Sequence, residues 1–389
     1  MNAEEIIRNA TDALREGLEY RDAGQLSQSA EALERALNLL PREPEILYLV
    51  GTVAHERGEW VKAIRHLGAA IAARPEEFRY HGQLAQTLRA MGRIEAAEER
   101  FRTALRLAPE DPAIRVNFGA MLQEAGRIEE AVTHYRQALE RHPELVEAHF
   151  NLGSALGELN QNEEAEFHYR ATLRLRPEHD RAHYNLGILL QNEGLFAETI
   201  SCFTQACALR PDYTRARWKM LLSLPILIDD DSRIPEIRAR WRQGVQTLLA
   251  TTRPQTSRER RETWEAASSV TNFYLNYHGQ NDREEQRLYG QLLTRVAQAC
   301  FPGHIQAPPP RRIAPGEKMR VGFVSSYFCG HSIFKTHSRW ITGLDGTRFE
   351  RFVFHTGEKF DLSSRHIQER VEHFFHLPPT LPPESLIET

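Results

Sequence analysis

One loop near the C-terminal end of the sequence contains a histidine that is placed for acid–base chemistry. The run MRVGFVSS (319–326) is rich in β-forming residues, and the loop VSSYFCGHS (324–332) leads from it into a stretch with helical spacing. Ligands bind where a strand of an open α/β sheet passes into a helix, and helix N–H groups attract phosphate. His331 could therefore act as general base toward a hydroxyl group. The loop has no GxGxxG or P-loop pattern, so a surface or packing role for His331 is the alternative.

Three asparagines form a second candidate site. Asn117, Asn151 and Asn185 are equally spaced, and each precedes a Phe-Gly or Leu-Gly step. An amide side chain offers a donor and an acceptor together, so a row of such groups can pair with the main chain of an extended peptide. The alternative is that each amide binds the backbone of a neighbouring repeat. Gln83 is a partial match one interval earlier.

The asparagines belong to a longer periodicity that predicts the elements around them. Prolines recur at the same interval, at Pro41, Pro75, Pro109, Pro143, Pro177 and Pro211. A period of 34 is that of the helix-turn-helix unit called the tetratricopeptide repeat, which this pattern resembles. Six tandem units exceed the roughly three that a stable array needs. We therefore predict that residues 10–213 form a right-handed α-solenoid with a concave inner surface.

Small and large residues alternate within this period in a way that fits packed helix pairs. Small residues recur where two helices must approach closely, at Gly17, Gly51, Ala85, Gly119, Gly153 and Gly187. Turn residues follow at Gly24, Gly58, Gly92, Gly126, Asn160 and Gly194, and Asn is the commonest other residue that tolerates a positive φ. Bulky residues of the second helices are Leu67, Phe101, Tyr135, Tyr169 and Phe203.

Composition excludes several classes of function. The 389 residues carry a net charge of −4, so no overall positive field favours nucleic acid. The longest aliphatic run, 221–228, is far shorter than the ~20 residues that cross a bilayer, and the N-terminus lacks a secretory h-region. Four cysteines without a CxxC pair suit a reducing compartment. We expect a cytoplasmic protein without a metal site, because no acid or cysteine completes a set with His366, His373 and His376.

After the solenoid, the pattern predicts a change of architecture. Residues 214–301 read as a helical connector that begins with a divergent repeat, and the polar segment 252–261 within it reads as a surface loop. Residues 302–318 contain five prolines and predict a stiff linker at a domain boundary.

Residues 319–389 predict an incomplete α/β segment with a Rossmann-like order of elements. Strands are expected at 319–326, 349–355 and 374–377, with a helix at 363–371, and the first strand is expected to be buried. Three strands are fewer than the five or six of an ordinary nucleotide-binding lobe. The sequence therefore reads as the N-terminal portion of something longer.

Two further segments point to a family. The connector contains TNFYLNYHGQND (271–282), and RVGFVSSYFCGHS (320–332) opens the α/β segment. Together with the asparagine-bearing repeats, they resemble bacterial relatives of the protein O-linked N-acetylglucosamine transferases, including the SPINDLY group. The resemblance implies that residues 319–389 begin the first lobe of a GT-B fold and that His331 matches a histidine proposed there as catalytic base. Tyr327 replaces an acid of the family pattern, and CysGlyHisSer replaces GlyAsnHisPro.

The resemblance implies a protein O-glycosyltransferase. Such an enzyme would transfer N-acetylglucosamine from UDP-N-acetylglucosamine to Ser or Thr of proteins held by the repeat groove, without a cofactor or metal; SPINDLY-type relatives use GDP-fucose instead. The lobe that binds most of the donor is absent, so this form is expected to be inactive. The alternative is a non-catalytic tetratricopeptide adaptor, and a structural scaffold without a peptide groove is a third reading.

Overall fold

The computed structural model describes residues 2–225, 227–228, 230–302, 316–325, 328–329, 338–339 and 341–377. The chain divides into two compact units, Met1–Leu293 and Thr294–Thr389. The first unit is helical, and the second contains a small parallel sheet. None of the helices that the structure describes is both long enough and apolar enough to cross a membrane.

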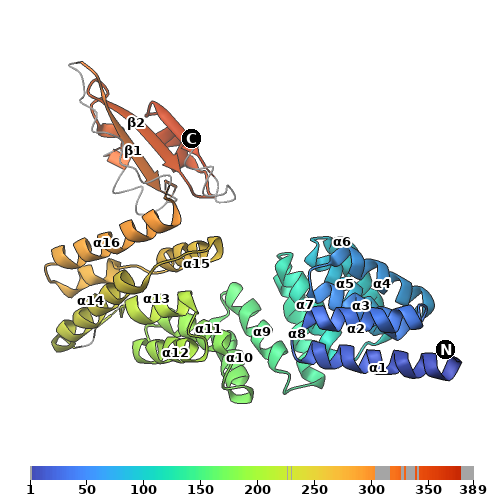
Figure 1. Cartoon of the computed structure of the whole chain (residues 1–389). Helices are drawn as coiled ribbons and strands as arrows, with labels where there is room; N and C mark the ends of the chain where they lie inside the picture. Colours follow the sequence, from blue (N-terminus) through green and yellow to red (C-terminus); the bar gives the residue numbers. More distant parts are fainter. Residues whose placement is uncertain are drawn as a thin grey trace. The chain divides into compact units, whose positions relative to one another are not determined.

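Residues 3–209 form six helix pairs, each joined by a tight turn, and Figure 1 shows the members of each pair lying side by side. In chain order the pairs are α1 (Ala3–Asp22) with α2 (Leu26–Leu39), α3 (Pro44–Glu56) with α4 (Trp60–Ala73), α5 (Phe78–Ala90) with α6 (Ile94–Leu107), α7 (Pro112–Glu124) with α8 (Ile128–Arg141), α9 (Val146–Glu158) with α10 (Asn162–Leu175), and α11 (Asp180–Asn192) with α12 (Phe196–Leu209). The predicted solenoid of six repeats is therefore present.

The turn inside each pair has the left-handed backbone that the sequence predicts. All six turn residues have a positive φ, between 59° at Asn160 and 80° at Gly194. Glycine adopts this conformation without a steric cost, and Asn tolerates it better than other residues with a side chain. The prediction for these turns is confirmed, including its one exception at Asn160.

Each helix pair packs through a small residue on the first helix and a bulky one on the second. A Cβ atom added to Gly119 would lie 2.7 Å from Cε1 of Tyr135, and one added to Gly51 would lie 2.7 Å from Cγ of Leu67. Both bulky side chains are fully buried. The predicted close approach is confirmed at these positions. Buried residues of adjacent repeats join into one continuous core from Ala54 to Leu190.

The connector begins with a seventh first helix whose partner differs from the earlier ones. Its elements are α13 (Thr214–Leu222), η1 (Asp231–Arg233), α14 (Ile234–Thr251), α15 (Ser257–Ser268), η2 (Phe273–His278) and α16 (Arg283–Cys300). In α13 the small-residue position of the repeat is occupied by Leu221, and Gly244 of α14 provides the close approach by lying against the Leu221 backbone. In this divergent repeat, therefore, the second helix provides the small residue of the contact, which the first helix provides in the earlier repeats.

The predicted loop at 252–261 is wrong in its second half, because α15 begins at Ser257. Thr256 accepts a hydrogen bond from the Glu259 backbone, and the Glu259 carboxylate accepts one from the Thr256 backbone. This capping box satisfies N–H groups that have no partner inside the helix. Arg258, Arg260 and Arg261 of the predicted loop therefore lie on the first turns of this helix.

The second unit contains a three-stranded parallel sheet of β1 (Met319–Ser325), β2 (Phe349–His355) and β3 (His373–His376), with α18 (Leu362–Gln368) between the last two strands. The spatial order is β1-β2-β3, so β2 is central and β1 is an edge strand. The expectation of a buried first strand is wrong: alternate residues of β1 are exposed, and Val324 is 69% exposed. The core of the sheet lies around Val353, which is fully buried.

An ion pair between the buried Arg351 and the more exposed Glu372 holds the central strand to the segment before β3. Arg351 Nε donates to Glu372 Oε2 at 2.9 Å, and Arg351 Nη1 donates to the Thr342 carbonyl at 3.2 Å. The Arg351 guanidinium lowers the pKa of Glu372 to about 2. The pair therefore stays ionised over the ordinary pH range.

Candidate functional site

Asn117, Asn151 and Asn185 occupy the same place on three successive first helices. Each is the sixth residue of a 13-residue helix, in α7, α9 and α11 respectively. Helix α9 contacts both α7 and α11, and all three asparagines are half-buried. The repeat thus arranges the three amides as a row along one side of the solenoid, here called the asparagine ladder.

The hydrogen bonds of the asparagine ladder leave most of its polar atoms available. Asn185 Nδ2 donates to the Tyr169 hydroxyl at 3.2 Å. For Asn117 and Asn151, no side-chain hydrogen bond to any residue in the described part of the chain is present. Contacts of these two amides to the backbone of a neighbouring repeat, the alternative reading of the pattern, are thus not found there. Gln83 is half-buried in the corresponding position of α5.

Tyrosines of the second helices reach toward the same side of the repeats. The Tyr135 hydroxyl donates to Gln123 Oε1 at 3.0 Å, and Gln123 Nε2 donates to Glu158 Oε1 at 2.5 Å. Burial raises the pKa of Tyr169 to about 12, so its hydroxyl stays protonated. These hydroxyls and amides form a largely buried hydrogen-bonded network beside the asparagine ladder, which ends at the Glu158 carboxylate.

Ion pairs and hydrogen bonds between successive first helices were missed by the sequence analysis. Arg21 Nη2 lies 2.5 Å from Glu56 Oε1, and Arg89 Nη2 lies 2.6 Å from Glu124 Oε1. The two partners are 35 residues apart in each case, as are Gln123 and Glu158. A search for complementary polar residues at this interval, one more than the repeat, would have found them.

The candidate catalytic base, His331, lies outside the described residues, as does much of the loop around it. The described part of the same sheet edge contains His355 at the end of β2. This side chain is fully buried, and its ring nitrogens lie 3.2 Å from the Ser325 carbonyl oxygen and 2.8 Å from that of Lys359. His355 thus ties the end of β1 to the loop after β2, which is a structural role.

The histidines of β3 also have partners. His373 Nε2 lies 2.9 Å from Glu350 Oε1, and His376 Nε2 lies 2.8 Å from the Gly357 carbonyl oxygen. The ring of His376 stacks on that of His355 at 5.0 Å. These contacts link β3 to β2 and to the loop that follows it.

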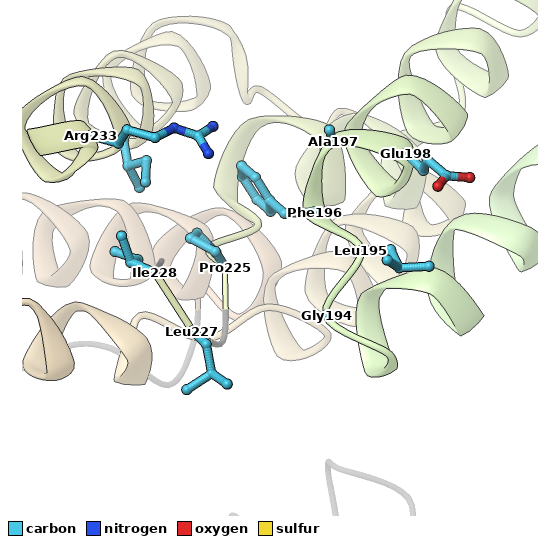
Figure 2. Close-up of a pocket in the computed structure, with 10 residues that line it drawn as sticks. Gly194, Leu195, Phe196, Ala197, Glu198, Pro225, Leu227, Ile228 and Arg233 are labelled. Carbon is cyan, nitrogen blue, oxygen red and sulfur yellow. The ribbon is translucent and has the colours of Figure 1, made fainter. Parts of the chain in front are cut away.

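A pocket of about 620 Å³ lies beside the turn between α11 and α12. Apolar residues line most of it, among them Phe196, Pro225 and Ile228, and Figure 2 shows the guanidinium of Arg233 pointing toward the ring of Phe196. The side chain of Leu227, which is 86% exposed, points away from the centre of the pocket. Few polar groups converge here, so the pocket lacks the donors and acceptors that orient a small ligand.

Comparison with known protein families finds matches in the part of the chain that contains the repeats. Family descriptions named "Tetratricopeptide repeat" match residues 14–81, 54–116 and 152–214, and one named "TPR repeat" matches 119–160. No curated protein sequence matches the chain.

Three solved structures are among those to which the chain is similar. The APC/C hetero-tetramer Cut9-Hcn1 matches with 17% identity and a TM-score of 0.51 over 55% of this chain and 42% of that one. The chain thus spans less than half of that relative. The pilF protein of Pseudomonas aeruginosa matches with 19% identity and a TM-score of 0.47, over 57% of this chain and 95% of that one. YrrB, described as a TPR protein with an unusual peptide-binding site, matches with 19% identity and a TM-score of 0.38 over 48% and 96%.

The matched residues, 14–116 and 119–214, are those in which helix pairs, left-handed turns and glycine contacts recur with the period of the prolines. Over this half of its length, the chain belongs to the tetratricopeptide-repeat proteins.

Proposed function

We propose that this protein is an adaptor that binds an extended segment of a partner protein along the asparagine ladder. The observation that carries the proposal is the row of three amides in equivalent positions, two of which have no side-chain hydrogen bond within the described residues. A tetratricopeptide solenoid presents one long side formed by its first helices, and such a surface suits an extended chain better than a compact ligand.

The chemistry of the asparagine ladder suits recognition of a peptide main chain. Each amide accepts from a backbone N–H and donates to a backbone C=O, and neither contact depends on the guest's side chains. The bond from Asn185 to the Tyr169 hydroxyl uses one of its two N–H groups and orients the amide. The adaptor would therefore tolerate different guest sequences, with selectivity coming from residues beside the ladder.

The test is a selection of peptides on the intact chain. Random dodecapeptides displayed on phage are panned on the full-length protein, and the affinity of selected peptides is then measured for the Asn117→Ala, Asn151→Ala, Asn185→Ala triple variant. Loss of three hydrogen-bonding groups should weaken binding about a hundredfold, at ~1 kcal/mol for each. The triple variant should be slightly more stable, because Ala exceeds Asn in helix propensity by several tenths of a kcal/mol.

The control is Asn38→Ala, which removes an exposed amide from the second helix α2. This variant should bind the selected peptides as the parent does. Unchanged affinity in the triple variant would refute the role of the asparagine ladder, and a failure to select any peptide would count against the adaptor itself.

A second candidate is a glycosyltransferase whose first lobe begins at residue 319. It is supported by the segment 320–325, which carries the resemblance to the O-linked N-acetylglucosamine transferases and forms the first strand of a parallel sheet. On this proposal, the sheet belongs to a Rossmann-like GT-B lobe and His331 is the catalytic base. Calorimetry with UDP-N-acetylglucosamine and GDP-fucose separates the candidates, because an adaptor should give no heat with either. Undiminished sugar transfer by a His331→Ala variant would exclude the catalytic role.

A further inference from the structure

The position of the asparagine ladder recurs once more, in the connector. Lys219 lies one repeat interval after Asn185 and is the sixth residue of α13, as Asn185 is of α11. Two hydrogen bonds join these helices: Lys219 Nζ donates to Gln191 Oε1 at 3.2 Å, and Gln191 Nε2 donates to the Ser223 hydroxyl at 3.2 Å. Lys219 therefore continues the row of amides with a positive charge.

The helix that carries Lys219 is firmly held. Arg240 of α14 donates to the carbonyl oxygen of Met220 at 3.0 Å and to that of Ser223, which are C-terminal groups of α13 without an intrahelical partner. Gly244 lets α14 lie directly against the backbone at Leu221. These contacts flank Lys219 on its C-terminal side, so its side chain extends from a fixed position.

The ammonium group of Lys219 lacks a counter-charge. Its side chain is half-buried, and no carboxylate in the described part of the chain lies within 4 Å of it. Burial lowers its pKa, and no charged neighbour opposes that effect. The hydrogen bond to Gln191 uses one of its three N–H donors, which leaves two for a ligand.

Several arginines of the other first helices differ in this respect. Each forms an ion pair with a carboxylate of a neighbouring helix: Arg21 with Glu56, Arg79 with Glu45, and Arg89 with Glu124. On α13 itself, Arg215 is paired with Glu265. A half-buried cation without such a partner costs stability, and a carboxylate supplied by a ligand would offset that cost.

We propose that Lys219 binds a carboxylate of the peptide that lies along the asparagine ladder, at the residue just beyond Asn185. The carboxylate is either an Asp or Glu side chain of the guest or its free C-terminus. The inference rests on the proposed function. It adds a charged contact at one end of a row of neutral ones, so the guest is held in one place and one direction along the row.

The experiment uses two synthetic libraries of random dodecapeptides, one with free C-termini and one with amidated C-termini. Both are selected on the full-length protein and on its Lys219→Met and Lys219→Arg variants. The parent should select Asp or Glu at one position from the amidated library if the source is a side chain, or should bind free C-termini preferentially if the source is the chain end. Lys219→Met should lose that preference, and Lys219→Arg should retain it.

Individual peptides provide the quantitative test. Replacing the selected acid by its amide, or amidating the C-terminus, should weaken binding to the parent about tenfold and leave binding to Lys219→Met unchanged. Without peptide, Lys219→Met should melt at the same or a higher temperature, since a half-buried ammonium group without a counter-charge is removed. The matched control is Lys62→Met on the second helix α4, where Lys62 is paired with Glu34; it should leave the acid preference intact.

The possible results distinguish the proposed role of Lys219 from the proposed adaptor function. If peptides bind and require the asparagine ladder, but show no acid preference or keep it in Lys219→Met, the role of Lys219 is wrong and the adaptor stands. If no peptide binds the parent from either library, both fail.

Discussion

Two histidines of the fifth repeat lie with their rings in contact. His149 of α9 and His168 of α10 are buried, and their Nδ1 atoms are 2.9 Å apart. His149 Nε2 lies 2.9 Å from the Pro143 carbonyl oxygen and donates to it, so its Nδ1 accepts the hydrogen from Nδ1 of His168. Burial and the neighbouring His149 lower the pKa of His168 to about 4.

This pair predicts a loss of stability in acid. Besides His149, the charged groups that act on His168 are Glu164 of its own helix and Arg136 of α8. Because its pKa is lower in the folded protein than in the unfolded chain, stability is intact above pH 6.5 and falls as the pH drops from about 6.5 to about 4, by at most about 3 kcal/mol. Urea unfolding of His168→Gln and of the parent across this range should give curves that converge in acid.

Burial also lowers the pKa values of His55, His66, His134 and His179, so the difference between the two proteins is the readout. Replacement of the exposed His142 by Gln should leave the pH dependence as in the parent. Parallel curves for the parent and His168→Gln would show that His168 does not carry the effect.

Sequence reasoning identified equivalent residues at this scale but not their partners. The repeat interval placed Asn117, Asn151 and Asn185 at one position of three helices. It could not show that Asn185 meets the Tyr169 hydroxyl, because that contact depends on side-chain torsions and on the stacking of two helices. Lys219 was missed for another reason: α13 has no closing proline, and the search for asparagine stopped at the sixth repeat.

At the scale of the helix, the contact between a glycine and a bulky residue decides how closely two elements approach. The space at Gly119 is filled by Tyr135, and similar contacts recur at Gly17, Gly51 and Gly187. In contrast, Gly157 of α9 has open space where a side chain would lie. A side chain would therefore clash at Gly119 of α7 but would be accommodated at Gly157 of α9.

Gly119→Val should therefore destabilise the protein by about 2–3 kcal/mol, because the added atoms overlap the ring of Tyr135. Gly157→Ala, the matched control, should stabilise it by up to ~1 kcal/mol through helix propensity alone. Thermal unfolding followed by circular dichroism measures both. A neutral effect of Gly119→Val would mean that the helix pair can separate without cost.

Two elements were misjudged from signals that the sequence contains. The series Thr256 to Glu259 is a capping-box pattern, and it marks the start of α15 within a segment that its composition suggested was a loop. In β1, Arg320 and Gly322 alternate with Val321 and Phe323, which is the pattern of a half-exposed strand. Local patterns were more informative than composition in both cases.

At the scale of the whole chain, the two units are built on separate cores and should respond to separate mutations. The sheet depends on Arg351 and Glu372, whose contacts join β2 to the residue before β3. Glu372→Gln leaves the buried guanidinium without its counter-charge and should destabilise the sheet by about 2 kcal/mol. Hydrogen exchange should accelerate in residues 349–376, while the exposed Glu369→Gln leaves it unchanged; equal exchange in both variants would contradict this role.

The solenoid could be predicted over its whole length because the repeats share the same left-handed turn, the same contact between a small and a bulky residue, and the same interval between them. The second unit occurs once, and its strand order is a non-local property that three short segments do not specify. The run at 349–355 was predicted with its observed bounds, since β2 is the central strand and each of its residues is at least partly buried. The edge position of β1 depended on which strand pairs with which.

The regular placement of left-handed turns has a consequence for how such a chain can change in length. Excision of one complete repeat brings together two surfaces that already match, since every internal repeat offers the same faces to its neighbours. A deletion of any other size would rotate all downstream helices out of phase. Growth and loss by whole modules, through duplication or recombination, are therefore the changes that this architecture tolerates.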